Sequence, residues 1–166
     1  TLGALQGIGL AIGLAMLVLL IRSSRPGEAV LGRVEGLQGF HDVALHEGAS
    51  LVPGLVLYRF SASVIFYNAP YFKRRVLAIA HANPSARMLI IDGAPILHLD
   101  STGADTIVEV KNELAALGIG LVFGGVAPQA RRMLERSGAL TVLGEDAIFP
   151  TLRLAVAAHE SAPATR

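Results

Sequence analysis

The chain has 166 residues, of which 52% are hydrophobic and 16% are charged, and it contains no cysteine. This length allows one domain with a hydrophobic core and an additional segment, and the missing thiols exclude disulfides and thiolate metal sites. The net charge of +1 gives no global positive field, so the composition does not indicate a nucleic-acid-binding protein.

Residues 1–21 (TLGALQGIGLAIGLAMLVLLI) form an uncharged apolar run. A helix of this length covers about 30 Å, which matches the hydrocarbon core of a bilayer. Gly3 and Gly7, and then Gly9 and Gly13, have the GxxxG spacing that lets another helix approach closely. The run therefore predicts a membrane-spanning helix that packs against further helices. A cleaved signal peptide and a buried core helix are the alternatives.

Basic residues follow the apolar run directly, at Arg22 and Arg25, with Arg33 a little later. A signal peptide would carry its charges before the run, so this order favours a span. By the positive-inside bias, the C-terminal side of the span is expected in the cytoplasm. The predicted location is thus the cell (inner) membrane, with everything after the span in the cytosol.

Residues 22–53 contain many glycines and few apolar clusters, which predicts an irregular linker and lead-in segment. From residue 54 onward, strand and helix patterns alternate, as in βα units with a parallel or mixed sheet. Residues 54–159 are therefore expected to form one domain. Residues 160–166 (ESAPATR) are expected to be a disordered tail.

Within this domain the element types follow from local patterns. Strands are expected over residues 55–60, 88–91 and 119–123, with shorter candidates over 96–99 and 140–143. Helices are expected from residue 69 after the cap Asn68, and over 103–117, 128–136 and 149–158. The continuous apolar run MLII at 88–91 is typical of a central strand that is covered on both faces.

Three segments in this order resemble the STAS domain found at the C-terminus of SulP-family anion transporters. One contains the aromatic-Asn-Ala signature Phe66, Asn68 and Ala69, and another contains Asp92 and the Asp-Ser-Thr-Gly loop. The segments are residues 54–76, 89–110 and 134–156, and the stretch GFHDV at 39–43 resembles the family's linker. The resemblance covers essentially the whole chain, including the preceding span.

The resemblance implies an α/β fold: a STAS-like domain with a four- to five-stranded mixed sheet, helices mainly on one side, and one preceding transmembrane helix. It implies that the parent is a secondary transporter of inorganic anions such as sulfate or bicarbonate. The domain would act as a cytosolic regulatory and assembly module, without catalytic residues or a cofactor. Its implied partners are the rest of the transporter membrane domain, the lipid bilayer, a cytosolic regulatory protein or a nucleotide, and a second copy of the chain.

The loop Asp100, Ser101, Thr102 and Gly103 is the sharpest candidate site, because it lies between a strand and a helix start. Free amides and the helix dipole favour an anion there. In the anti-sigma-factor antagonists that share the fold, the hydroxyl residue before the glycine is phosphorylated, and Thr102 occupies that position. The alternative is that Ser101 or Thr102 simply caps the helix.

Lys73, Arg74 and Arg75 form a short basic run, which joins Arg22 and Arg25 as candidate membrane-proximal contacts. These cations would meet anionic lipid or the cytosolic loops of the transporter. A solvated helix face is the alternative.

Other chemistries have weaker support. Gly124–Gly125 could form a phosphate cradle, but the Walker and Rossmann patterns are absent and a turn explains both glycines. His98 lies in no G-x-S-x-G context, and residues 41–47 (HDVALHE) lie in a linker, so neither a hydrolase nor a metal site is predicted. Two further alternatives remain: a membrane-anchored signalling module switched at Thr102, and an anion- or nucleotide-binding domain.

Overall fold

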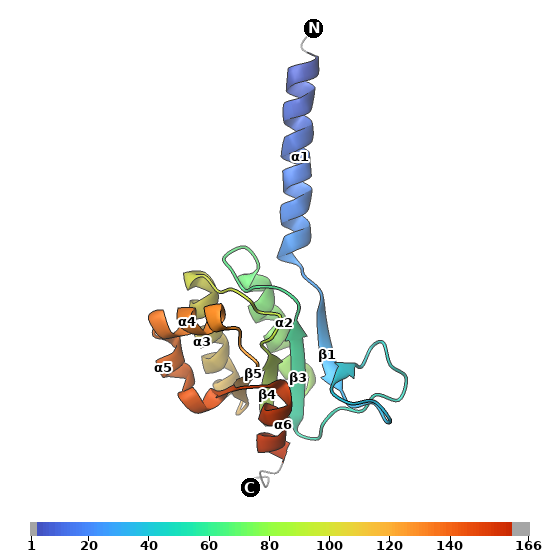
Figure 1. Cartoon of the computed structure of the whole chain (residues 1–166), viewed down its shortest axis with the longest axis vertical. Helices are drawn as coiled ribbons and strands as arrows, with labels where there is room; N and C mark the ends of the chain where they lie inside the picture. The colour runs from blue at the N-terminus through green and yellow to red at the C-terminus, as the bar shows by residue number, and fades with distance from the viewer. Residues whose placement is uncertain (1–2, 161–166) are drawn as a thin grey trace.

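A computed structural model describes residues 3–160, and its most prominent feature is a long helix that stands apart from an α/β domain (Figure 1). This helix, α1 (Ala4–Ser24), has no buried residue. Among the described residues it is the one helix that is long and apolar enough to cross a bilayer. The run predicted to span the membrane is thus helical as far as it is described, and the helix continues to Ser24. Thr1 and Leu2 lie outside the described residues.

The domain is built on a six-stranded sheet with the order β2-β1-β3-β4-β5-β6. The strands are β1 (Glu28–Gly32), β2 (His41–Asp42), β3 (Leu55–Phe60), β4 (Met88–Asp92), β5 (Gly120–Gly124) and β6 (Ile148–Phe149). Strands β3 to β6 run parallel, whereas β1 is antiparallel to both of its neighbours. The predicted α/β fold with a mixed sheet is confirmed.

Five helices and one 3₁₀ turn follow α1 in the described part of the chain. They are α2 (Ala69–Ala82), α3 (Ser101–Ala116), α4 (Pro128–Arg136), α5 (Ala139–Leu143), the 3₁₀ turn η1 (Glu145–Ala147) and α6 (Leu152–Glu160). Helix α2 packs beside α3 on one face of the sheet, and α4 and α5 extend this layer. Helix α6 packs on strands β3, β4 and β5 from the other face (Figure 1).

Strand β4 is buried on both faces, as its uninterrupted apolar sequence predicts. Leu89, Ile90 and Ile91 have no exposed side-chain surface. Ile90 lies opposite Leu57 of β3 and Val122 of β5, and these residues form the centre of the core. A strand covered by helices on both faces reads as a continuous rather than an alternating apolar run.

The segment 22–53, expected to be irregular, contains two strands, so the sheet has six strands rather than four to five. Strand β1 pairs with β3, and Leu31 is fully buried in the core. The glycines that suggested a linker fall mostly in the loops around it; Gly36, Gly39 and Gly48 all have positive φ. Because the run EAVL is short and lies among these turn residues, its sequence did not predict a strand.

Two further element assignments are wrong. Residues 140–143 form helix α5 rather than an edge strand, because Gly138 at φ +78° redirects the chain and Leu140 and Leu143 face the core. The edge strand is Ile148–Phe149 instead; Phe149 was assigned to the last helix, which begins only at Leu152. Glu160 ends that helix and does not belong to a tail; residues 161–166 lie outside the described part.

Residues 96–99 form no regular strand. One isolated bridge joins Leu99 to Val64, just before the aromatic-Asn-Ala signature. The bridge nevertheless places the segment before α2 beside the segment before α3, which builds the site described next.

Candidate functional site

The N-terminus of α3 is capped by Asp100, and this carboxylate also holds a neighbouring loop. Asp100 Oδ1 accepts the backbone N–H of Gly103 at 2.7 Å, and Oδ2 accepts the N–H of Phe66 at 2.8 Å. The backbone of Asp100 is extended, as an N-cap requires. The expectation that Ser101 or Thr102 caps the helix is therefore wrong, since the cap lies one residue before them.

Asn68 fixes the loop that Asp100 holds. Its side chain is buried; Oδ1 accepts the N–H of Ile65 and Nδ2 donates to the carbonyl of Ser63, both at 2.9 Å. Ser63 Oγ in turn accepts the N–H of His98 at 3.1 Å. The Asn of the aromatic-Asn-Ala signature thus ties the loop before α2 to the loop before α3.

Gly103 allows these two loops to touch. A Cβ at this position would lie 2.0 Å from the carbonyl oxygen of Val64, which is a backbone atom that cannot turn away. Only glycine fits this close approach. The glycine of the Asp-Ser-Thr-Gly loop therefore has a packing role.

Ser101 and Thr102 remain exposed at the surface of this junction. The carbonyl of Thr102 accepts the hydroxyl of Thr106 at 2.7 Å, whereas its own hydroxyl takes no part in the cap. An anion at this helix end would lie beside the Asp100 carboxylate, which disfavours capture of a free anion there.

The three basic residues of the run on α2 lie in different electrostatic environments. Lys73 forms ion pairs with Glu109 at 2.8 Å and Glu113 at 2.6 Å on α3, and these hydrogen bonds raise the pKa of Lys73. Arg75 turns to the other side of α2 and pairs with Glu28 at 2.5 Å. Of the three cations in the run, Lys73 and Arg75 are thus neutralised within the domain.

Glu28, which sequence analysis did not single out, organises a polar cluster at the start of β1. Besides Arg75, its carboxylate accepts the hydroxyls of Tyr58 and, at 3.3 Å, Tyr71. Burial and the hydrogen bond to Glu28 raise the pKa of Tyr58 far above its ordinary value. The sequence signal that could have identified this cluster is a single acid, four residues after α1, directly before the apolar run AVL.

Arg74 is exposed and forms no ion pair in the described part of the chain. Its guanidinium lies over the ring of Tyr71, 5.4 Å from the centroid. The side chain borders a small hollow of about 190 Å³ where α1 ends against the domain. The hollow is lined by Ser24, Arg25, Tyr67, Pro70, Tyr71 and Arg74. The structure therefore brings Arg25 and Arg74 together and separates them from Lys73 and Arg75.

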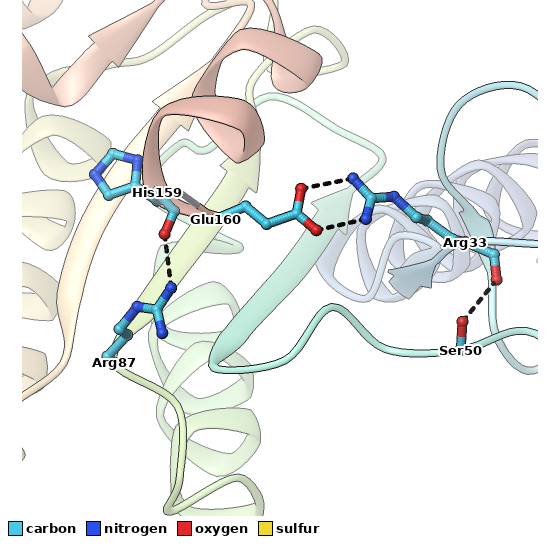
Figure 2. Close-up of polar contacts among 5 residues, drawn as sticks. All are labelled: Arg33, Ser50, Arg87, His159 and Glu160. Atoms are coloured by element: carbon cyan, nitrogen blue, oxygen red, sulfur yellow. Dashed lines mark hydrogen bonds and ion pairs between the residues drawn. The ribbon is translucent and has the colours of Figure 1, made fainter. Parts of the chain in front are cut away.

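The C-terminal end of α6 is held by two arginines (Figure 2). Sequence analysis named Arg33 only as one of the cations that follow the apolar run, and it did not name Arg87. The two terminal guanidinium nitrogens of Arg33 donate to the two carboxylate oxygens of Glu160, at 2.6 and 2.8 Å. Arg87 donates to the carbonyl of His159 at 2.7 Å, which satisfies a free carbonyl at the helix end. The segment after α1 is thereby fastened to the last helix.

Gly124 and Gly125 serve packing and turning. A Cβ on Gly124 would lie 2.4 Å from Cα of Leu152, so this glycine lets α6 approach β5, and Gly125 has φ +79°. The open hollow beside them, of about 510 Å³, is bordered by the ion pair of Arg59 with Asp92 at 2.7 Å. Within residues 3–160, no group of three potential metal ligands lies together.

Comparison with known proteins gives one family and a consistent set of relatives. The family model described as "STAS domain" matches residues 49–155. The chain is 35% identical over 158 residues to the probable sulfate transporter Rv1739c of Mycobacterium tuberculosis, covering 95% of this chain and 28% of that protein. The chain thus spans little more than a quarter of the length of this relative.

Two solved structures share the fold. The murine anion transporter Solute Carrier 26 family member A9 matches 93% of this chain and 26% of its own, with a TM-score of 0.79 and 17% identity. An anti-sigma factor antagonist from Mycobacterium paratuberculosis matches 80% of this chain and 93% of its own, with a TM-score of 0.52 and 20% identity. The fold therefore occurs both in an anion transporter and in an anti-sigma factor antagonist.

Proposed function

The chain belongs to the STAS domain family, and on this premise we propose that it is the cytosolic end of a membrane secondary transporter of inorganic anions such as sulfate or bicarbonate. In this proposal α1 is one span of the transporter's membrane domain. The domain that follows, over residues 54–159 with the lead-in strands, regulates and assembles the transporter and carries out no reaction of its own.

The observation that carries this proposal is the extent of the sequence match. The alignment with the probable sulfate transporter covers 158 residues, whereas the STAS family match covers residues 49–155. Because 158 of 166 residues align, most of α1 is included along with the domain. A match through both parts favours a transporter over a free-standing module that acquired an unrelated anchor.

The surface of α1 supports packing within a membrane domain. A Cβ added to Gly3, Gly7, Gly9 or Gly13 would meet nothing within 4 Å, so each glycine leaves the helix backbone open to close approach. Small residues at this spacing favour helix–helix contact in lipid. Arg22 and Arg25 at the other end support a cytoplasmic domain through the positive-inside bias.

Removal of the domain from the full-length transporter tests the proposal. Truncation after Arg33 should lower anion uptake per molecule in proteoliposomes, or lower the amount of transporter in the membrane. A matched control removes only residues 161–166 and leaves every described element of the domain intact. Unchanged uptake and abundance after truncation at Arg33 would contradict a regulatory or assembly role.

A second candidate, phosphorylation at Thr102, is favoured by one specific observation: Thr102 is exposed while Asp100 performs the capping. A phosphate there would add up to about two negative charges at this exposed start of α3. Thr102→Glu should then change binding of the domain to its partner, measured by co-purification with the transporter's membrane domain, whereas Thr102→Ala should not. Equal binding by wild type and both variants would remove this candidate.

A further inference from the structure

We propose that the hollow between the end of α1 and the start of α2 binds the phosphate group of an anionic phospholipid from the adjacent leaflet. This inference rests on the proposed function only in requiring that α1 crosses the bilayer. The hollow has a volume of about 190 Å³, which suits a headgroup phosphate rather than a large ligand. Its walls combine Arg25, which directly follows α1, with Arg74 and the rings of Tyr67 and Tyr71 from the α2 region.

The charges at the hollow are complementary to a phosphate. Neither Arg25 nor Arg74 forms an ion pair among the residues the structure describes, and the same holds for Arg22 in the last turn of α1. Glu28 accepts a hydrogen bond from Tyr71 in the wall of the hollow, and its carboxylate is already occupied by Arg75 and Tyr58 as well. Arginine guanidinium groups without a carboxylate partner are good donors to phosphate.

The position of the hollow matches the depth of the headgroups. Helix α1 has 21 residues and therefore extends about 30 Å, the thickness of the hydrocarbon core, so its C-terminal end lies at the interface. In Figure 1 the loop before α2 lies beside this end of α1. That loop presents Phe66, whose side chain is 65% exposed, next to Tyr67. Aromatic side chains are enriched at this level of a membrane.

Lys73 shows why the site is specific to Arg25 and Arg74. It lies on the same helix as Arg74, but Glu109 and Glu113 neutralise it on the side facing α3. A general attraction of α2 to anionic lipid would involve both Lys73 and Arg74, whereas a headgroup site at the hollow involves Arg74 and not Lys73. The two residues therefore provide a test within one helix.

The experiment uses the whole chain reconstituted in bilayers. The sequence contains no tryptophan, so Phe66→Trp places a single, selectively excitable tryptophan next to Tyr67 without lining the hollow. Quenching is measured with phosphatidylglycerol or phosphatidylcholine brominated near the top of the acyl chain, each titrated into unbrominated phosphatidylcholine. The ratio of the two association constants should favour phosphatidylglycerol by about tenfold or more, since each basic residue at the surface contributes about fivefold.

Arg25→Gln and Arg74→Gln, each made in the Phe66→Trp chain, should each lower this ratio about fivefold. Lys73→Gln should leave it unchanged. Equal quenching by the two lipids in the parent chain, or an equal effect of Lys73→Gln and Arg74→Gln, would overturn the inference. Loss of selectivity on adding millimolar inorganic phosphate at constant ionic strength would also overturn it, because the site would then take a free anion.

Flotation of the same vesicles separates this inference from the proposed function. A chain that stays with the vesicles at high pH but shows no lipid selectivity contradicts only the headgroup site. A chain that is released from the vesicles contradicts the membrane span itself, and with it both proposals.

Discussion

At the start of α3, the backbone of Gly103 lies so close to the carbonyl of Val64 that no side chain fits between them. We expect Gly103→Ala to lower the free energy of unfolding by about 3 kcal/mol, because the loops before α2 and α3 must separate. Chemical denaturation in detergent, followed by circular dichroism, measures this loss. Gly27→Ala is the matched control, since its Cβ would meet only Ser61 at 3.9 Å; an equal loss in both variants would contradict the packing role.

In the same loop, Asp100 caps the helix, whereas Thr102 is exposed and does not contribute to the cap. Asp100→Ala removes the acceptor for two backbone amides, so we expect it to cost about 2 kcal/mol of unfolding free energy. Thr102→Ala and Thr102→Glu should each change that free energy by less than about 0.5 kcal/mol, because the side chain is exposed. Denaturation curves for the three variants test this division. A large loss with Thr102→Ala would mean that the hydroxyl supports the fold after all.

Single residues also show where sequence reasoning reached its limit. The Asp-Ser-Thr-Gly loop was found correctly between a strand and a helix because that pattern is local. Its cap was misassigned because the second partner of Asp100 is Phe66, 34 positions away. The cluster around Glu28 was missed for the same reason: its partners lie on β3 and α2, and only the folded chain brings them together.

Among the elements, α6 is fastened at its end by Arg33 and Arg87 rather than by a capping residue of its own. The hydrogen bonds from Arg33 lower the pKa of Glu160. A carboxylate with a lowered pKa stabilises the folded state above its ordinary pKa, and this contribution disappears as pH falls through the folded-state pKa. The pair therefore acts at neutral pH and is lost in acid.

We expect Glu160→Gln to lower the free energy of unfolding at pH 7 by less than about 1 kcal/mol, because the pair is exposed and screened by water. The difference from wild type should shrink as the pH falls below about 4, and in high salt. Denaturation at several pH values measures it. Glu47→Gln is the control, because Glu47 is exposed and forms no ion pair with any residue from 3 to 160; a difference that persists in acid would contradict the assignment.

Elements with strong local patterns were predicted well, and those that depend on tertiary context were not. Strand β4 and helix α3 have continuous or periodic apolar sequences that leave little choice of structure. Strand β1 is short and surrounded by glycines, and its pairing with β3 is fixed by the chain leaving α1 at that edge of the sheet. Helix α5 has only five residues, a length at which helix and strand patterns cannot be distinguished.

At the scale of the whole molecule, one chain contains an apolar helix with basic residues at its C-terminal end and an α/β domain. Both parts are needed to argue the function. The domain's fold alone occurs in both a transporter and an anti-sigma factor antagonist. The alignment through α1 favours the transporter. Both the regulatory role and the headgroup site require that α1 crosses the membrane, and the regulatory role also requires the domain on its cytoplasmic side.

Cysteine labelling of intact cells measures that arrangement directly, because the chain has no cysteine of its own. Thr1→Cys precedes α1 by three positions in the sequence, and Leu117→Cys lies on the domain just after α3, with 44% of the side chain exposed. A membrane-impermeant maleimide should label Thr1→Cys in intact cells and Leu117→Cys only after permeabilisation. Labelling of Leu117→Cys in intact cells, or recovery of the chain in the soluble fraction, would contradict the account.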